Sequence, residues 1–367
     1  MTKNVHHLLL KIGITLVPGI GPVIGKKLIN YFGNLEELFQ QNRKSLTSIS
    51  GMRAETVESI TRKTYLKKAE KEVDFIRKHK IQPLFYLDDN YPFRLKNCID
   101  SPMMLYYRGT ADLNASKIIA VVGTRNATEY GQEVTMKLIE GLAEYKAVVV
   151  SGLAYGIDSL AHKYSLQMGL QTIGVLAHGL DRIYPAKNKN MAGKMLQQGG
   201  LLTEFMSETN PDRENFPRRN RIVAGLADAV VVVESAKKGG ALITADIANS
   251  YNRDVFAIPG NVGKEFSEGC NFLIKSNRAA LADSAAEIAR MMGWEEKKMP
   301  PRQKKLFIKL SEDEEKLLEL LKQNNETGID RLCLASAIPP TRAASALLNL
   351  EFQGIVKCMP GKIYRLL

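Results

Sequence analysis

The sequence predicts an α/β fold in which a mostly parallel sheet, covered by helices, lies between a helical N-terminal domain and a C-terminal winged-helix domain. Residues 116–293 alternate short apolar runs with helical patterns, and continuous Val, Ile and Leu runs are typical of strands buried on both faces. Residues 1–80 show only short helical patterns. We therefore expect domains at 1–80, 81–293 and 311–367, with the charged stretch 294–310 as a linker.

The N-terminal domain begins with a motif that resembles a helix-hairpin-helix. The sequence LVPGIGPVIGKKL runs from Leu16 to Leu28, and Ser48–Arg53 looks like a degenerate second copy. In such motifs the hairpin amides contact a DNA phosphate without reading sequence. Between Lys26 and Lys80 there are 13 basic and 7 acidic residues, a net charge of +6. A DNA contact and a scaffold role both remain open for this helix-hairpin-helix-like (SAM-like) domain.

Six apolar runs predict the strands of the central sheet: 117–123, 147–152, 172–177, 201–205, 229–235 and 254–260. Ligands of open α/β sheets bind at the carboxyl ends of the strands, where glycine turns allow close approach. The first run leads into a Gly-Thr-Arg turn followed by a helix after Gly131, the second into a Ser-Gly turn, and the fifth into a Lys-Lys-Gly turn. These ends give the first candidate phosphate-binding residues: Gly123, Thr124, Arg125, Ser151, Gly152, Lys237, Lys238 and Gly239.

A cluster of arginines supplies the other candidates. Pro217 suits the first position of a helix, which would place Arg218, Arg219, Asn220 and Arg221 in the first helical turn. Cations at that end oppose the helix dipole unless an anion neutralises them, and a guanidinium can hold a phosphate through two hydrogen bonds. The pattern therefore predicts anion binding.

The sequence lacks the patterns that carry enzyme chemistry. We find no P-loop, no H-E-x-x-H or G-x-S-x-G motif, no metal-ligand spacing and no dinucleotide fingerprint. His162 follows Asp158 by one helical turn, and we interpret them as a hydrogen-bonded pair that fixes the loop rather than as a general base. The aromatic residues Tyr86, Tyr91, Phe93, Tyr106 and Tyr107 are interpreted as core rather than as stacking platforms. We expect no catalytic residue, cofactor or metal.

Composition favours a polyanionic partner in the cytoplasm. The net charge is +12 and the pI about 9.3, a balance common among nucleic-acid-binding proteins. The four cysteines are scattered without a C-x-x-C pair, as expected in a reducing compartment. No apolar run approaches the roughly 18 residues of a membrane span, and the first residues do not read as a signal peptide.

The C-terminal domain predicts helices at about 314–323, 328–336 and 341–353, then strands around 355–357 and 362–365. Ser311 and Glu314 suit a capping box, and Thr341 suits the N-cap of the recognition helix. Residues 311–367 carry 7 basic and 8 acidic residues, a net charge of −1. Because phosphate contacts supply most of the affinity of duplex binders, we expect this domain to contact a protein partner or the rest of the chain rather than DNA.

Taken together, these motifs resemble the DNA-processing protein A (DprA/Smf) family. The matching stretches keep their order over about 190 residues: Tyr91-Pro92, 120–125, 150–158, 179–185, 216–221, 240–244, Pro259-Gly260 and 269–274. The resemblance implies an extended Rossmann-like fold with a mixed sheet, a homodimer, a basic pocket for single-stranded DNA, and loading of a RecA-type recombinase onto DNA taken up in transformation. It implies a pocket at Arg125, Ser151, Gly152, Arg218, Arg219, Asn220 and Lys238.

The chain departs from the family pattern at two places. Lys238-Gly239-Gly240-Ala241 stands where the family usually has a serine. Residues 275–279 lack the usual glycine, which puts that local turn in question.

Two alternatives remain open from the residues. The fold also resembles that of LOG-type nucleotide phosphoribohydrolases, although their catalytic glutamate has no counterpart here and only Asp246 is nearby. The second alternative is a winged-helix transcription regulator with a ligand-sensing Rossmann domain.

Overall fold

A computed structural model describes residues 3–49, 51–294, 310–324, 326–359 and 362–366. The chain divides into two compact units, Met1–Glu295 and Glu296–Leu367, and each is described by itself. The predicted linker at 294–310 lies almost wholly outside the described residues.

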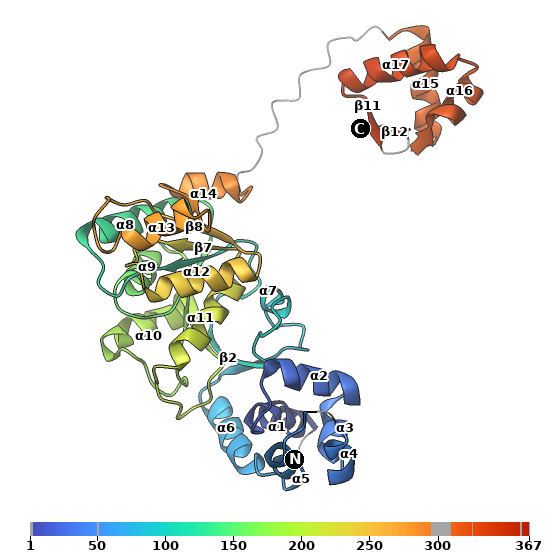
Figure 1. Cartoon of the computed structure of the whole chain (residues 1–367). Coiled ribbons are helices and arrows are strands. Elements are labelled where there is room, and N and C mark those ends of the chain that lie inside the picture. Colours follow the sequence, from blue (N-terminus) through green and yellow to red (C-terminus); the bar gives the residue numbers. More distant parts are fainter. Residues whose placement is uncertain (1–2, 50, 295–309, 325, 360–361, 367) are drawn as a thin grey trace. The chain divides into compact units, whose positions relative to one another are not determined.

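Figure 1 shows the whole chain. The first unit is built on a nine-stranded sheet of strand order β1-β2-β6-β5-β4-β3-β7-β8-β9. All neighbours from β6 to β9 pair in parallel, whereas β1 and β2 form an antiparallel edge. All six predicted strands are confirmed. The strands are β1 (Gln82–Phe85), β2 (Met104–Gly109), β3 (Ile118–Val122), β4 (Val148–Ser151), β5 (Thr172–Val175), β6 (Gly199–Thr203), β7 (Ala229–Val232), β8 (Asp254–Ala257) and β9 (Ala280–Leu281).

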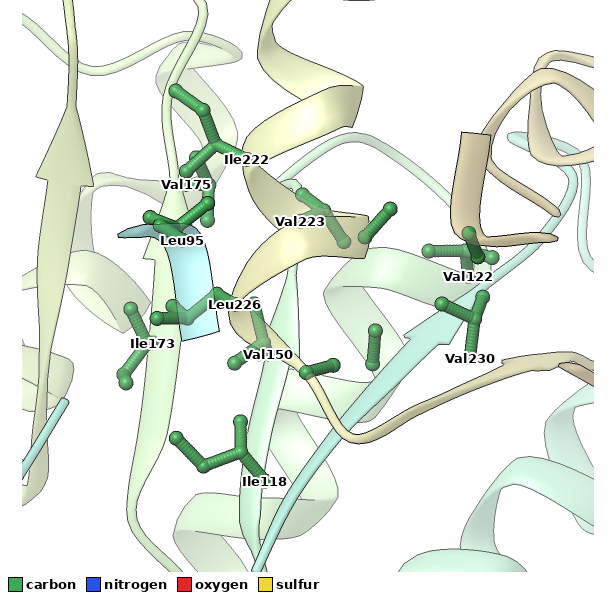
Figure 2. Packing of buried hydrophobic residues seen from close by; sticks show 14 of the residues in the cluster. Leu95, Ile118, Val122, Val150, Ile173, Val175, Ile222, Val223, Leu226 and Val230 are labelled. Carbon is green, nitrogen blue, oxygen red and sulfur yellow. The ribbon is translucent and has the colours of Figure 1, made fainter. Parts of the chain in front are cut away.

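Alternate residues of the central strands enter two cores on opposite faces of the sheet. Ile118, Ala120 and Val122 of β3 belong to one core, while Ile119 and Val121 belong to the other. Figure 2 shows the first core, where residues of α11 pack between β3, β4 and β5. The helices on this face are α7 (Phe93–Lys96), α11 (Asn215–Leu226), α12 (Gly240–Ser250) and α13 (Glu268–Lys275); the other face carries α8 (Glu129–Glu144), α9 (Ile157–Gln167), the short turn η1 (Ala186–Asn188), α10 (Lys189–Gln198) and α14 (Ala285–Met291).

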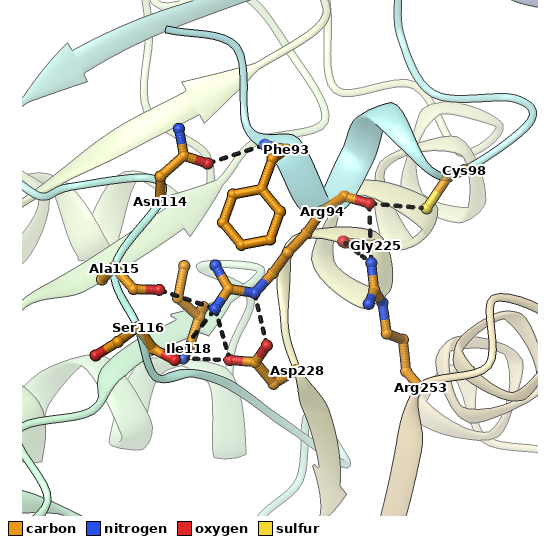
Figure 3. A network of polar contacts seen from close by, with 10 residues as sticks. All are labelled: Phe93, Arg94, Cys98, Asn114, Ala115, Ser116, Ile118, Gly225, Asp228 and Arg253. Carbon is orange, nitrogen blue, oxygen red and sulfur yellow. Dashed lines mark hydrogen bonds and ion pairs between the residues drawn. The ribbon is translucent and has the colours of Figure 1, made fainter. Parts of the chain in front are cut away.

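A polar network holds the amino ends of β3 and β7 (Figure 3). Arg94 of α7 donates two hydrogen bonds to Asp228, at 2.7 and 2.9 Å, and a third to the Ala115 carbonyl at 2.8 Å. Asp228 in turn accepts from the Ile118 amide at 2.8 Å. Arg94 is only 3% exposed, and its pairing with Asp228 offsets part of the cost of burying its charge; its Nη1 has no partner among the described residues. The network thereby fixes the carboxyl end of α11.

Six helices form the N-terminal part and pack on the β1–β2 edge. Their core includes Ile12, Leu38 and Ile60 together with Phe85 of β1 and Tyr106 of β2. The Thr56 hydroxyl donates to the Pro18 carbonyl at 2.7 Å and so joins the two predicted hairpins. The helices are α1 (Lys3–Leu16), α2 (Pro22–Phe32), α3 (Leu35–Gln40), α4 (Arg43–Thr47), α5 (Ala54–Thr61) and α6 (Leu66–Lys78).

The second unit has the predicted order of helices and strands plus one strand that sequence reasoning missed. It comprises α15 (Glu312–Gln323), β10 (Glu326–Gly328), α16 (Ile329–Ser336), α17 (Pro340–Phe352), β11 (Val356–Met359) and β12 (Ile363–Leu366). The three strands form one antiparallel sheet, and the predicted turn at Pro360-Gly361 lies outside the described residues. The capping box of Ser311 and Glu314 is confirmed.

Several predicted details were wrong. The recognition helix α17 begins at Pro340 with Pro339 as its N-cap, so Thr341 is its second residue, because proline itself suits the first helical position. Helix α8 begins at Glu129, before Gly131, because the Thr128 hydroxyl caps it. The turn after α13 needs no glycine, since Asn277 adopts the left-handed φ of 54°, which asparagine tolerates better than most residues.

The aromatic residues of 86–107 belong mainly to the core, as predicted. Tyr91, Tyr106 and Tyr107 are at most 4% exposed. Tyr86 is partly buried, and Phe93 is half exposed.

Candidate nucleic-acid interface

A pocket of about 350 Å³ opens at the carboxyl ends of β3 and β7. These neighbouring strands are followed by connections that leave in opposite directions, β3 toward β4 and β7 toward β8. Such a switch point is where open α/β sheets bind ligands. Six of the predicted site residues line the pocket: Gly123, Thr124, Arg125, Arg219, Asn220 and Gly239.

Two helix N-termini form part of the pocket wall. Helix α12 contributes Gly240 and Ala241, and α11 contributes Phe216 and Pro217. The positive end of a helix dipole and its first amides favour a bound anion. Helix α11 begins at Asn215, two residues before the predicted start. The arginines therefore lie in its second turn, and the predicted crowding of the first turn was wrong.

Arg219 is a buried cation at the base of this pocket. Its side chain is 5% exposed, and Nη1 lies 4.0 Å from Oδ2 of Asp158 on α9 and 3.3 Å from the Val175 carbonyl, to which it donates. Within the described residues, Nε has no hydrogen-bond partner. Burial lowers the pKa of Arg219, and Asp158 partly opposes this shift. The Arg219 guanidinium thus keeps one N–H that no described residue accepts.

Glycines allow the loops around Arg219 to approach one another. A side-chain carbon at Gly152 would overlap the Arg219 guanidinium, and one at Gly156 would overlap the backbone of Thr124 and Arg125. Gly156 also has a φ of +73°, a conformation that glycine adopts without strain. The backbone amides of Gly152 and Ala154 donate to Asp158, so this carboxylate fixes both the loop and the arginine.

Arg125 lies at the pocket mouth with an aromatic partner. It is exposed, and its guanidinium lies 5.1 Å from the ring centre of Phe216. Tyr184 packs edge-on to Phe216, with ring centres 6.1 Å apart. Together with Tyr155, these residues line a small adjoining hollow. Phe216 and the two tyrosines were not predicted as site residues, although Phe216 lies only two residues before Arg218.

The remaining arginines of α11 do not line the pocket. Arg218 is more than half exposed, and its guanidinium lies 5.1 Å from the ring centre of Phe205. Arg221 points away from the pocket. It pairs with Glu204 at 2.5 Å and donates to the Asp100 carbonyl. Residues 219 and 221 are two apart and so face different sides of the helix. The structure therefore separates Arg221 from the pocket.

Four other predicted residues also lie outside the pocket lining. The Ser151 hydroxyl is buried and donates to the Val121 carbonyl. Gly152 lines the adjoining hollow rather than the pocket, where it contacts Arg219 and donates its amide to Asp158. Lys237 and Lys238 are exposed on the turn before α12. Ser235 and Thr244, which sequence reasoning missed, line the pocket instead.

Asp158 and His162 do not bond to each other as predicted. His162 is fully buried, and its Nδ1 lies 2.7 Å from Oγ1 of Thr172. That hydroxyl donates to the Val149 carbonyl, so it accepts from Nδ1–H and leaves Nε2 without a proton. Burial lowers the pKa of His162 to about 3. The predicted pair was therefore wrong: Asp158 fixes the loop through the amides of Gly152 and Ala154, and His162 contacts Thr172.

Comparison with known proteins decides the family. Residues 82–293, more than half of the chain, match the family described as DNA recombination-mediator protein A. Residues 11–63 match a SAM-like helix-hairpin-helix tandem, and residues 298–362 match the DprA winged-helix domain. The chain belongs to the DprA/Smf family. The description of this family names the mediation of DNA recombination.

Relatives of the family align over most of this chain. Protein Smf of Synechocystis is 31% identical over 95% of this chain and 96% of its own length. The X-ray structure of DprA from Streptococcus pneumoniae superposes with a TM-score of 0.66 at 33% identity, covering 78% of this chain and 97% of that one. A Helicobacter pylori DprA structure, whose description names its single-stranded DNA binding mode, has a TM-score of 0.53 at 29% identity and covers 58% of this chain and 95% of that one.

The family assignment agrees with the chemistry of the pocket. Asp246, the residue nearest to a hydrolase glutamate in sequence, pairs with Arg278 and does not line the pocket. Among the described residues, no group of three or more His, Cys, Asp or Glu side chains is placed to hold a metal ion. No described helix has both the length and the apolarity needed to cross a membrane.

Proposed function

We propose that this DprA/Smf protein binds single-stranded DNA in the pocket at the ends of β3 and β7 and delivers it to a RecA-type recombinase. The observation that carries the proposal is the buried cation Arg219, which lines a pocket walled by two helix N-termini. A phosphate is the anion that such donors suit. Its charge would also stabilise an arginine that burial now penalises.

The aromatic residues at the pocket mouth favour a single strand over a duplex. Phe216 lies under Arg125, and Tyr155 and Tyr184 are 46% and 47% exposed beside it. Unpaired bases can stack on such rings, whereas paired bases are already stacked on their neighbours. Stacking does not read base edges, so we expect little sequence preference. The relative from Helicobacter pylori, with its described single-stranded DNA binding mode, supports this proposal.

The delivery to a recombinase and the homodimer rest on the family. The family description names recombination mediation, and we infer from it a contact with the recombinase. We place the homodimer contact at the edge strand β9. Leu281 on β9 and Phe272 on α13 are each 43% exposed, and an open edge strand with apolar neighbours is a surface that a second copy can cover.

Fluorescence anisotropy with a labelled 20-nucleotide oligothymidine tests the DNA proposal. We expect tighter binding to this strand than to a 20-base-pair duplex. The logarithm of affinity should fall with that of salt concentration by about 0.7 per phosphate contacted. Phe216→Ala should weaken binding to the strand by about 1–3 kcal/mol, the value of one stacked base. Lys137→Ala, on the exposed surface of α8, is the matched control. Affinity that is insensitive to salt, or equal for both substrates, would contradict the proposal.

A further inference from the structure

Helix α17 of the second unit presents an outer stripe that no other described residue of the unit covers. The stripe consists of Thr341, Ser345, Leu348 and Phe352, which follow helical spacing and are all exposed. Leu348 is 50% and Phe352 82% exposed. The opposite side of the helix carries Ala343, Ala346, Leu347 and Leu350, which form the core of the unit.

The charges around this outer stripe are unsuited to DNA. None of its four residues is charged. The one basic residue of α17, Arg342, is held by Asp313, with Nη2 at 2.7 Å and Nε at 2.9 Å from Oδ2. A winged helix that reads duplex DNA needs free cations on its recognition helix for the phosphates. An uncharged stripe with two large apolar side chains suits a protein surface.

The order of side-chain sizes along the stripe identifies the partner. The small residues Thr341 and Ser345 occupy the N-terminal half, and the large residues Leu348 and Phe352 occupy the C-terminal half. In an antiparallel pair of α17 helices centred between Ala346 and Leu347, position 348 faces 345 and position 352 faces 341. Each large side chain then meets a small one, which is how packed helices interdigitate.

We propose that the outer stripe is a homotypic contact, in which α17 pairs antiparallel with α17 of a second copy of this chain. A parallel pair would instead place Phe352 against Phe352 and Ser345 against Ser345, which overfills one end and leaves a gap at the other. The antiparallel arrangement has two-fold symmetry, so the same stripe serves both copies. It also opposes the two helix dipoles.

The contact is small and depends on concentration. Helix α17 has 13 residues and is about 20 Å long, so one helix pair buries less than the roughly 800 Å² per partner of a standard interface. Two copies held together elsewhere, for example on one DNA strand, reach an effective concentration in the millimolar range. The pairing therefore forms between chains that are already neighbours.

Cysteine cross-linking in the full chain tests this proposal. Cys333 and Cys358, the half-buried cysteines of this unit, are first replaced by serine. Ser345→Cys and Leu348→Cys proteins are then prepared separately, mixed and oxidised with copper phenanthroline. The antiparallel pair predicts an interchain disulfide at least fivefold more abundant in the mixture than in either protein alone. Phe352→Glu in both proteins should abolish the excess, whereas Gln323→Glu, which adds the same charge at the exposed end of α15, should leave it.

Three results would overturn the proposal. Equal cross-linking in the mixture and in the separate proteins would mean a parallel or random contact. An excess that survives Phe352→Glu would mean that the stripe is not the contact. An absence of cross-links, combined with a loss of duplex affinity in Phe352→Glu, would make the stripe a DNA contact; without that loss, a different protein would be its partner.

Discussion

The guanidinium of Arg219 lies where the first side-chain carbon of any larger residue at position 152 would stand. Gly152 follows β4, and Arg219 belongs to α11, 67 positions later in the chain. Because Gly152 has no side chain, the Arg219 guanidinium can occupy that space. This relationship links the stability of the protein directly to the position of the pocket's buried cation.

We expect Gly152→Ala to reduce both stability and single-strand affinity. Overpacking of a filled interior costs about 1–3 kcal/mol, and relief is possible only if Arg219 moves. Chemical denaturation and anisotropy with oligothymidine measure the two effects. Gly193→Ala is the control because its added carbon meets nothing within 4 Å and it lies within α10; it should raise stability by up to about 1 kcal/mol. Unchanged binding in a folded Gly152→Ala protein would show that Arg219 does not contact DNA.

Arg125→Ala and Arg219→Ala should separate binding from stability. Arg125 is exposed at the pocket mouth, so its loss should weaken single-strand binding by about 1.5–3 kcal/mol, the contribution of a charged hydrogen bond, without changing the melting temperature. For Arg219→Ala we expect a similar loss of affinity together with a loss of stability on the order of 3 kcal/mol, because Asp158 remains buried and unpaired.

A second replacement checks the cause of that loss. Asp158→Asn combined with Arg219→Ala removes both charges and should recover part of the stability but none of the affinity. If the double variant is no more stable than Arg219→Ala, the pairing with Asp158 is not the cause.

His162 should make the protein sensitive to acid. Its pKa is about 3 in the folded protein and about 6.5 in the unfolded chain. The unfolded chain therefore binds the extra proton first. Stability is fully present above pH 6.5 and falls as the pH drops toward 3, by up to about 1.4 kcal/mol per pH unit. Protonation would place a charged N–H at Nε2, which has no partner among the described residues.

Comparison with His162→Gln isolates this contribution. The free energy of unfolding, measured by denaturant titration at several pH values from 7 to 4.5, should fall less steeply in the variant. Burial raises the pKa values of Asp158 and Glu204, which stabilises the folded protein as the pH falls, but this effect is common to both proteins. Parallel pH profiles would mean that His162 is protonated in the folded state.

A chain that ends at Trp294 should keep most of its single-strand affinity. The sequence predicted that the central domain ends at residue 293. In the structure Met292 and Trp294 both pack against the core beneath α8 and α14, so ending the chain at residue 293 would remove the packing of Trp294. Loss of DNA binding in a folded protein ending at Trp294 would make the winged-helix unit a primary DNA site.

The strands and the ends that carry the pocket could be predicted because they depend on local pattern. Buried parallel strands such as β3 and β7 are apolar at nearly every position, and the carboxyl ends of parallel strands necessarily share one edge. The burial of Arg219 could not be predicted, because it depends on Gly152 and Asp158 from other elements. The sequence also placed the start of α11 at Pro217 rather than at Asn215. Which of the four consecutive polar residues 218–221 faces the pocket depends on the rotation of this helix, and the packing of other elements sets that rotation.

The shared core of the N-terminal helices and the β1–β2 edge has a consequence for how this chain can be divided. Phe85 and Tyr106 are almost fully buried only while the helices cover them. Cutting the chain near residue 80, at the boundary that the sequence suggests, would uncover an apolar sheet edge of the kind that aggregates or recruits chaperones. We therefore expect the helical segment not to fold stably without the sheet. The chain can be divided between its two compact units, after Glu295.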